Sequence, residues 1–73
     1  MPSKHTFDPE HIHPEAQVDL AVLVMSFQGQ GSTSPTFEHD FTDKLATLGF
    51  SQGYIADAIL YAESVAHRYP IHH

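Results

Sequence analysis

The stretch KLATLGFSQGYIADAIL (residues 44–60) carries the clearest structural signal in this 73-residue chain. Gly49 stands where a helix can end in a left-handed residue, because glycine adopts a positive φ without a Cβ clash. Ser51 then supplies a side-chain oxygen that can cap the next helix. Phe50, just before that cap, can pack against Ile55 as in a hydrophobic staple. The stretch therefore predicts two helices joined by a short, well-defined corner.

The sequence around this corner predicts the extent of three helices. The helix before the corner should span residues 35–48, because Ser34 followed by Pro35 is a typical helix start. The helix after the corner should run to about residue 69, where Pro70 stops it. Pro14 and the acidic Glu15 mark the start of an earlier helix over residues 14–28. We therefore expect an all-α fold, a single small three-helix domain over residues 14–70 with a helix-turn-helix corner.

The helix over residues 14–28 is more apolar than one buried face requires, since its apolar side chains fall on two sides of a helical wheel. A strand remains an alternative, because period alone does not assign a short apolar run. A chain this short buries only about 60% of its unfolded surface, so sharing a core with a second copy would stabilise it. We expect a homodimer whose interface consists of Val18, Leu20, Val22, Met25 and Phe27.

Residues 1–13 are polar and contain two prolines, so we expect a flexible N-terminal tail. His11 and His13 in this segment are ligand types that zinc, nickel and copper accept. Two histidines are fewer than the three or four fixed ligands of a metal site. We therefore predict no metal and no cofactor, and we retain His-based metal binding as an alternative function.

The chain is acidic, with three Lys and Arg against nine Asp and Glu and a formal charge of −6. Nucleic-acid binding depends on a basic face, and Lys4, Lys44 and Arg68 are too few and too scattered to form one. A basic protein surface is a more plausible partner. The longest apolar run, residues 20–25, is too short to span a bilayer. With no cysteine and no visible signal peptide, we expect a cytoplasmic protein that does not bind membranes.

No pattern in the sequence indicates catalysis. The sequence contains no Gly-x-Ser-x-Gly, no His-Glu-x-x-His and no phosphate-binding loop. Glu38, His39 and Asp40 are adjacent on a predicted helix and would point in different directions. A helical bundle of this size also has little room to enclose a substrate. We predict that the chain is not an enzyme.

Residues 45–59 resemble the helix-turn-helix of phage-repressor-type regulators. The Gly49 turn, the Ser51-Gln52 pair and the later Ile55 and Ala58 stand at the positions of that pattern. The resemblance implies DNA binding by the second helix of the pair. The positions that would face DNA carry no basic side chain: Ser51, Gln52, Gly53, Ala56, Asp57 and Leu60. A DNA-binding regulator is therefore an alternative function.

The segments 48–50 (Leu-Gly-Phe) and 58–59 (Ala-Ile) also resemble the first half of a ubiquitin-associated domain. This resemblance implies binding to the apolar patch of ubiquitin. The sequence departs from the family at residues 63–65 (Glu-Ser-Val), which offer no turn into a third helix. A purely structural corner, with Gly49 as the cap and Phe50 in the core, explains the same residues.

These observations together predict a small acidic regulatory protein that acts by binding another protein. Its target would be a transcription or defence factor, which it would hold as an inhibitor or anti-activator. Tyrosine often anchors protein interfaces, although core packing is an alternative for the tyrosines here. The predicted partner-binding residues lie on the helix after the corner: Gln52, Tyr54, Asp57, Leu60 and Tyr61.

Overall fold

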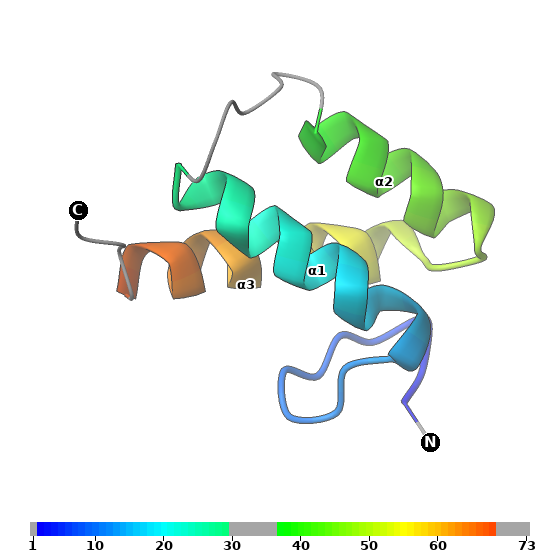
Figure 1. The fold of residues 1–73 in the computed structure, drawn as a ribbon. Coiled ribbons are helices and arrows are strands. Elements are labelled where there is room, and N and C mark those ends of the chain that lie inside the picture. Colours follow the sequence, from blue (N-terminus) through cyan, green and yellow to red (C-terminus); the bar gives the residue numbers. More distant parts are fainter. Residues whose placement is uncertain (1, 30–36, 69–73) are drawn as a thin grey trace.

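The computed structural model describes residues 2–29 and 37–68 and confirms the all-α fold (Figure 1). This part of the chain forms the helices α1 (Pro14–Phe27), α2 (Phe37–Thr47) and α3 (Gln52–Arg68). Each helix contacts the other two, and α1 packs most extensively against α3. Residues 14–27 are helical, so the strand alternative for this segment is wrong.

Where a predicted helix end lies within the described residues, it agrees with the structure to within one or two residues. The first helix ends at Phe27 with Gln28 as its cap, and the third ends at Arg68. The predicted start of the second helix at Ser34 and Pro35 lies outside the described residues, as does the stop at Pro70.

The corner between α2 and α3 closes with the hydrogen bonds of a glycine-terminated helix. Gly49 has a φ of 97°. The backbone N–H of Phe50 donates to the carbonyl of Leu45 at 3.0 Å, and that of Gly49 donates to the carbonyl of Ala46 at 3.1 Å. These two bonds form a Schellman motif, which satisfies carbonyls that the end of α2 would leave unpaired.

The start of α3 follows the predicted cap. The backbone N–H of Tyr54 donates to Oγ of Ser51 at 3.1 Å, which satisfies one of the free donors of the first turn. Phe50 and Ile55, the predicted staple pair, are both buried in the core. Local sequence therefore accounts for how α2 ends and α3 begins.

The core lies where one side of each helix meets the other two. Small residues recur every fourth position along α3, at Ala58, Ala62 and Ala66, and all three are buried. Their short side chains allow α1 to approach α3 closely. None of the described buried side-chain nitrogen or oxygen atoms lacks a hydrogen-bond partner. The cluster of buried residues comprises Ala16, Leu20, Leu23, Phe41, Leu45, Phe50, Tyr54, Ile55, Ala58 and Ala62.

A matched pair of glycine substitutions tests the corner. Gly49→Ala should lower the free energy of unfolding by about 1–2 kcal/mol, because alanine is strained at a positive φ. The added Cβ would meet no atom within 4 Å, so the cost is backbone strain alone. Gly53→Ala should raise stability by about 0.4–1 kcal/mol, because Gly53 is helical and the new Cβ would lie 3.9 Å from Oγ of Ser51. Urea denaturation measures both changes, and two changes of the same sign would contradict this account.

Candidate protein-binding surfaces

One side of α1 is apolar and exposed to solvent. Val18 is 74% exposed, Val22 54% and Met25 50%. Their spacing of four and then three residues places them on one side of the helix, with the exposed Ala21 between them. We call Val18, Ala21, Val22 and Met25 the α1 stripe. A contiguous exposed apolar patch of this kind commonly marks an interaction site.

The predicted dimer interface combines residues from both sides of α1, and the structure separates them. Leu20 is only 4% exposed and belongs to the core. Phe27 packs edge-on against Phe37 of α2, with ring centroids 5.3 Å apart. The prediction is wrong for Leu20, because its side chain is already buried within its own chain, whereas Phe27 is partly buried by its contact with Phe37. Val18, Val22 and Met25 remain accessible.

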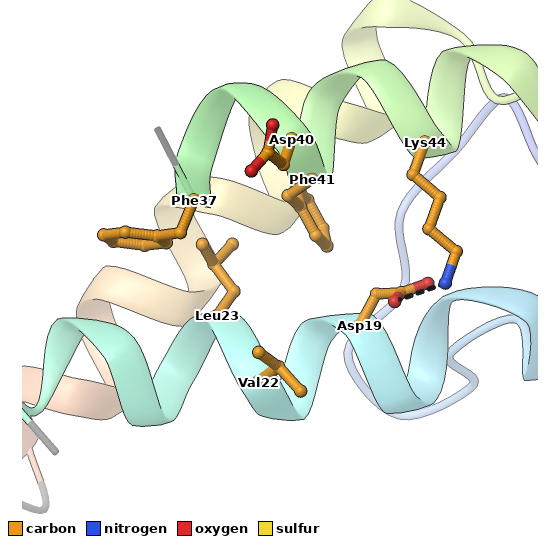
Figure 2. Close-up of a pocket in the computed structure, with 7 residues that line it drawn as sticks. All are labelled: Asp19, Val22, Leu23, Phe37, Asp40, Phe41 and Lys44. Atoms are coloured by element: carbon orange, nitrogen blue, oxygen red, sulfur yellow. Dashed lines mark hydrogen bonds and ion pairs between the residues drawn. The ribbon is translucent and has the colours of Figure 1, made fainter. Parts of the chain in front are cut away.

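A shallow groove lies between α1 and α2, next to the α1 stripe (Figure 2). Val22 and Leu23 from α1 and Phe37 and Phe41 from α2 supply its apolar lining. Its volume is about 230 Å³, which is below the roughly 300–1,000 Å³ of typical small-molecule sites. The groove therefore suits a few side chains of another protein better than an enclosed small molecule.

Charged groups border this α1–α2 groove. Nζ of Lys44 lies 2.8 Å from Oδ1 of Asp19, and this ion pair joins α2 to α1 across one end of the groove (Figure 2). The Asp19 side chain is only 18% exposed, so Lys44 compensates a partly buried carboxylate. Asp40, on α2 between the two phenylalanines, completes the lining. The groove thus has an apolar floor and a border that carries two aspartates and one lysine.

The outer face of α3 carries only part of the predicted partner-binding set. Gln52 and Asp57 are exposed, and Leu60 is 62% exposed. Tyr54 is 1% exposed, so the prediction that it contacts a partner is wrong. Tyr54 and Ala58, one turn apart, both face the core. Tyr61 is partly buried and packs against the same core cluster.

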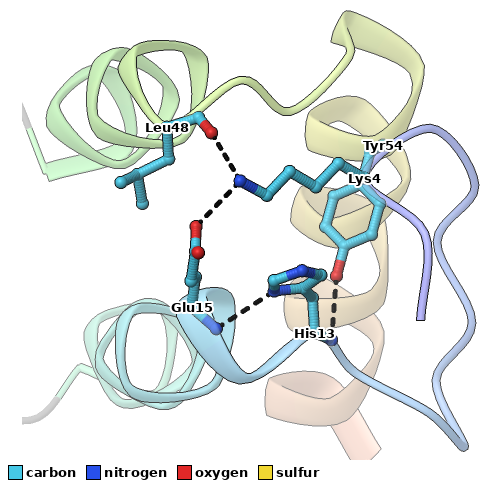
Figure 3. Close-up of polar contacts among 5 residues, drawn as sticks. All are labelled: Lys4, His13, Glu15, Leu48 and Tyr54. Atoms are coloured by element: carbon cyan, nitrogen blue, oxygen red, sulfur yellow. Dashed lines mark hydrogen bonds and ion pairs between the residues drawn. The ribbon is translucent and has the colours of Figure 1, made fainter. Parts of the chain in front are cut away.

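The N-terminal segment lies against the corner and the start of α1 (Figure 3). Nζ of Lys4 donates to the carbonyl of Leu48 at 2.7 Å and forms an ion pair with Oε2 of Glu15 at 3.0 Å. The backbone N–H of Ser51 donates to the carbonyl of Lys4 at 2.9 Å. Oγ of Ser51 donates to the carbonyl of His5 at 3.2 Å. The segment thus bonds to the carbonyl of Leu48, directly after α2, and to the cap of α3.

An aromatic residue anchors the same segment. The Phe7 ring lies edge-on to Tyr54 at 5.2 Å and tilted against Tyr61 at 5.3 Å, between ring centroids. Ile12 also packs against the core. The expected flexible tail over residues 1–13 is therefore corrected for residues 2–13, which form part of the packed fold. The segment is mostly polar, yet Lys4, Phe7 and Ile12 contact residues far along the chain.

His13 connects this segment to the start of α1. Its Nδ1 accepts a hydrogen bond from the backbone N–H of Glu15 at 3.2 Å, so it acts as the N-cap (Figure 3). Its backbone N–H donates to the hydroxyl of Tyr54 at 3.3 Å. Its ring stands edge-on to Phe50 at 5.1 Å. His13 therefore has a structural role that the sequence did not indicate, because histidine is an uncommon N-cap residue.

The histidines considered as metal ligands are engaged in different contacts. Nδ1 of His11 lies 3.0 Å from Oδ2 of Asp8, whereas Nδ1 of His13 caps α1. Within residues 2–29 and 37–68, no group of three or more His, Asp or Glu side chains is placed to hold a metal ion.

The exposed residues of α3 that correspond to a DNA-reading helix include no cation. Lys4 and Lys44 are each paired with a carboxylate, and Arg68 donates to Oγ of Ser64 near the far end of α3. Each of these lysines is therefore compensated by a carboxylate of the same chain.

None of the three helices has both the length and the apolar character needed to cross a membrane.

Comparison of the chain with protein-family models, with curated proteins and with solved structures gave no match. The resemblances of residues 45–59 to a helix-turn-helix and to a ubiquitin-associated domain remain predictions.

Substitutions in the N-terminal segment test whether it contributes to stability. Phe7→Ala should lower the free energy of unfolding by about 2 kcal/mol, because it removes a partly buried ring from two tyrosines. The matched change Thr6→Ala, at the exposed neighbouring residue, should have an effect within about 0.5 kcal/mol. Urea denaturation followed by circular dichroism measures both. Equal stabilities of the two variants would show that the segment is a loose tail.

The geometry of the turn before α1 predicts how the Asp8 carboxyl titrates in acid. A hydrogen bond from the backbone N–H of Glu10, and then one from the His11 side chain, lower the pKa of Asp8 below its ordinary value. The folded state thus favours the ionised carboxylate. The contribution of Asp8 to stability is present above the pKa of an unfolded aspartate, about 3.9, and is lost as pH falls through the lower folded value.

An NMR titration that follows the Asp8 side-chain carboxyl should give a midpoint below the ordinary aspartate value. His11→Ala should raise this midpoint only part of the way to the ordinary aspartate value, because the larger cause of the lowered pKa, the hydrogen bond from the Glu10 backbone, remains. A midpoint at or above the ordinary value in the unchanged chain would contradict the turn geometry.

Proposed function

We propose that this chain is a small acidic regulatory protein that acts by binding another protein, and that the partner occupies the α1–α2 groove. The supporting observation is an apolar groove, bordered by two aspartates and one lysine, beside an exposed apolar stripe. We also propose that the protein works in the cytoplasm and forms a homodimer.

The partner element that best fits this groove is an amphipathic helix or loop with basic flanks. Its apolar side chains would contact Leu23, Phe37 and Phe41, as in other helix-in-groove complexes. Its Lys or Arg side chains would lie near Asp40 and Asp19. The overall charge of −6 would steer such a basic element toward the protein from a distance.

The regulatory part of the proposal follows from the chemistry of such a partner. A basic, amphipathic surface is typical of proteins that bind nucleic acid. An acidic protein bound to this surface would prevent nucleic acid from binding there, without itself recognising a nucleotide sequence. We therefore propose an inhibitor or anti-activator of a transcription or defence factor as the specific role.

A charge-reversal pair distinguishes the α1–α2 groove from the outer face of α3. Asp40→Lys changes a residue of the groove, and Asp57→Lys makes the same change on the exposed side of α3. Affinity capture from the source cells, followed by mass spectrometry, identifies the partner. Asp40→Lys should weaken binding to that partner about tenfold, which corresponds to ~1.4 kcal/mol, and Asp57→Lys should leave it unchanged.

Both variants are first compared with the unchanged chain by thermal melting, because Asp40 also lies in the first turn of α2, where the helix dipole favours a carboxylate. If only Asp57→Lys weakens binding, the partner binds the face predicted from sequence and the groove proposal is wrong. If the unchanged chain captures no stoichiometric protein, the proposed function itself is wrong.

A further inference from the structure

The outward side of α1 is uncharged along most of its length, in a protein that is otherwise acidic. Its only charged residues are Glu15 and Asp19, both in the first half of the helix. Each is paired with a lysine of the same chain, Glu15 with Lys4 and Asp19 with Lys44. The exposed residues of α1 other than Glu15 are Pro14, Gln17, Val18, Ala21, Val22 and Met25.

We infer that a second copy of this chain docks on the α1 stripe, with the two α1 helices antiparallel about a two-fold axis between Ala21 and Val22. This inference rests on the homodimer of the proposed function and specifies its geometry. Like-charge repulsion between two chains of formal charge −6 disfavours contact through their acidic faces. The α1 stripe lets two copies approach without placing carboxylates against each other.

The antiparallel direction follows from where the charges lie. With the axis between Ala21 and Val22, Val18 lies opposite Met25 of the second copy, and Glu15 lies opposite Gln28. A parallel pair would instead bring Glu15 beside Glu15 and Asp19 beside Asp19, which like-charge repulsion disfavours. The small Ala21 at the axis allows the two backbones to approach closely. An isologous, two-fold contact of this kind is also the commonest symmetry of soluble oligomers.

The length of the stripe sets the expected strength of the dimer. Residues 18–25 span only about 10 Å of helix, so the contact falls at the low end of specific interfaces. We therefore expect a dissociation constant in the micromolar range. Because the copies carry charge of the same sign, added salt should strengthen the dimer by screening.

Disulfide trapping tests the geometry, since the chain contains no cysteine of its own. Val22→Cys places two sulfurs next to the axis, offset by about 1.5 Å along the helices, and should form a disulfide-linked dimer under mild oxidation. Val18→Cys separates the two sulfurs by about 10 Å and should not. A mixture of Val18→Cys and Met25→Cys chains should form the mixed disulfide. Leu60→Cys, on an equally exposed apolar residue of α3, is the matched control and should stay monomeric.

Sedimentation equilibrium on the purified chain measures the dimer without a cross-link and without a partner protein. Val22→Glu should raise the dissociation constant at least tenfold, and Leu60→Glu should leave it unchanged. Circular dichroism verifies that both variants fold, as expected for exposed positions.

Three outcomes would overturn the inference. The unchanged chain could remain monomeric at hundreds of micromolar, Val18→Cys could cross-link as readily as Val22→Cys, or Leu60→Glu could be the variant that dissociates the dimer. A monomeric chain whose Val18→Glu variant loses a captured partner would assign the stripe to that partner instead, because Val18 does not line the groove. Such a result would refute the dimer and leave the proposed protein-binding function standing.

Discussion

The Tyr54 side chain joins the parts of this structure that are distant in sequence. Its ring is almost fully buried and contacts Phe7 from the N-terminal segment and Phe50 from the corner. Its hydroxyl accepts a hydrogen bond from the backbone N–H of His13, at the start of α1. Tyrosine suits this position because it combines a large apolar ring with a polar tip that needs a partner when buried. The N-terminal segment, the corner and the start of α1 therefore all contact one residue of α3.

The corner could be predicted from the sequence because the bonds that end α2 and cap α3 are local. Gly49 and Phe50 bond to carbonyls of α2, and the Tyr54 N–H bonds to Ser51, within about one helical turn, and capping rules describe such bonds well. The N-terminal segment could not be predicted in this way. Lys4 donates to a carbonyl 44 residues away, and no local pattern marks that pair. The N-terminal segment is mostly polar, which usually indicates a tail, so the few side chains that attach it to the fold were not predicted.

The sequence also showed that α1 has two apolar sides, but not which of them faces the core. That choice depends on how α1 packs against α2 and α3, which buries Leu20 and Leu23 and leaves Val18 and Val22 in solvent. The same limit explains the wrong prediction for Tyr54. The prediction used the tendency of tyrosine to anchor interfaces, and only the contacts with Phe7 and His13 show that this side chain is covered. A helical pattern identifies apolar sides, and the tertiary fold decides which of them remain free for a partner.

The contacts of Lys4 and Phe7 also constrain the order in which the chain folds. Apart from Glu15, the partners named above, Leu48, Tyr54 and Tyr61, lie in the later half of the sequence. The segment that carries Lys4 and Phe7 is synthesised before any of these three residues. Contacts between such distant segments also carry a large loop-closure cost until the intervening helices have formed. The N-terminal segment is therefore expected to reach its native position late in folding, and the Tyr54 ring stays partly uncovered until it does.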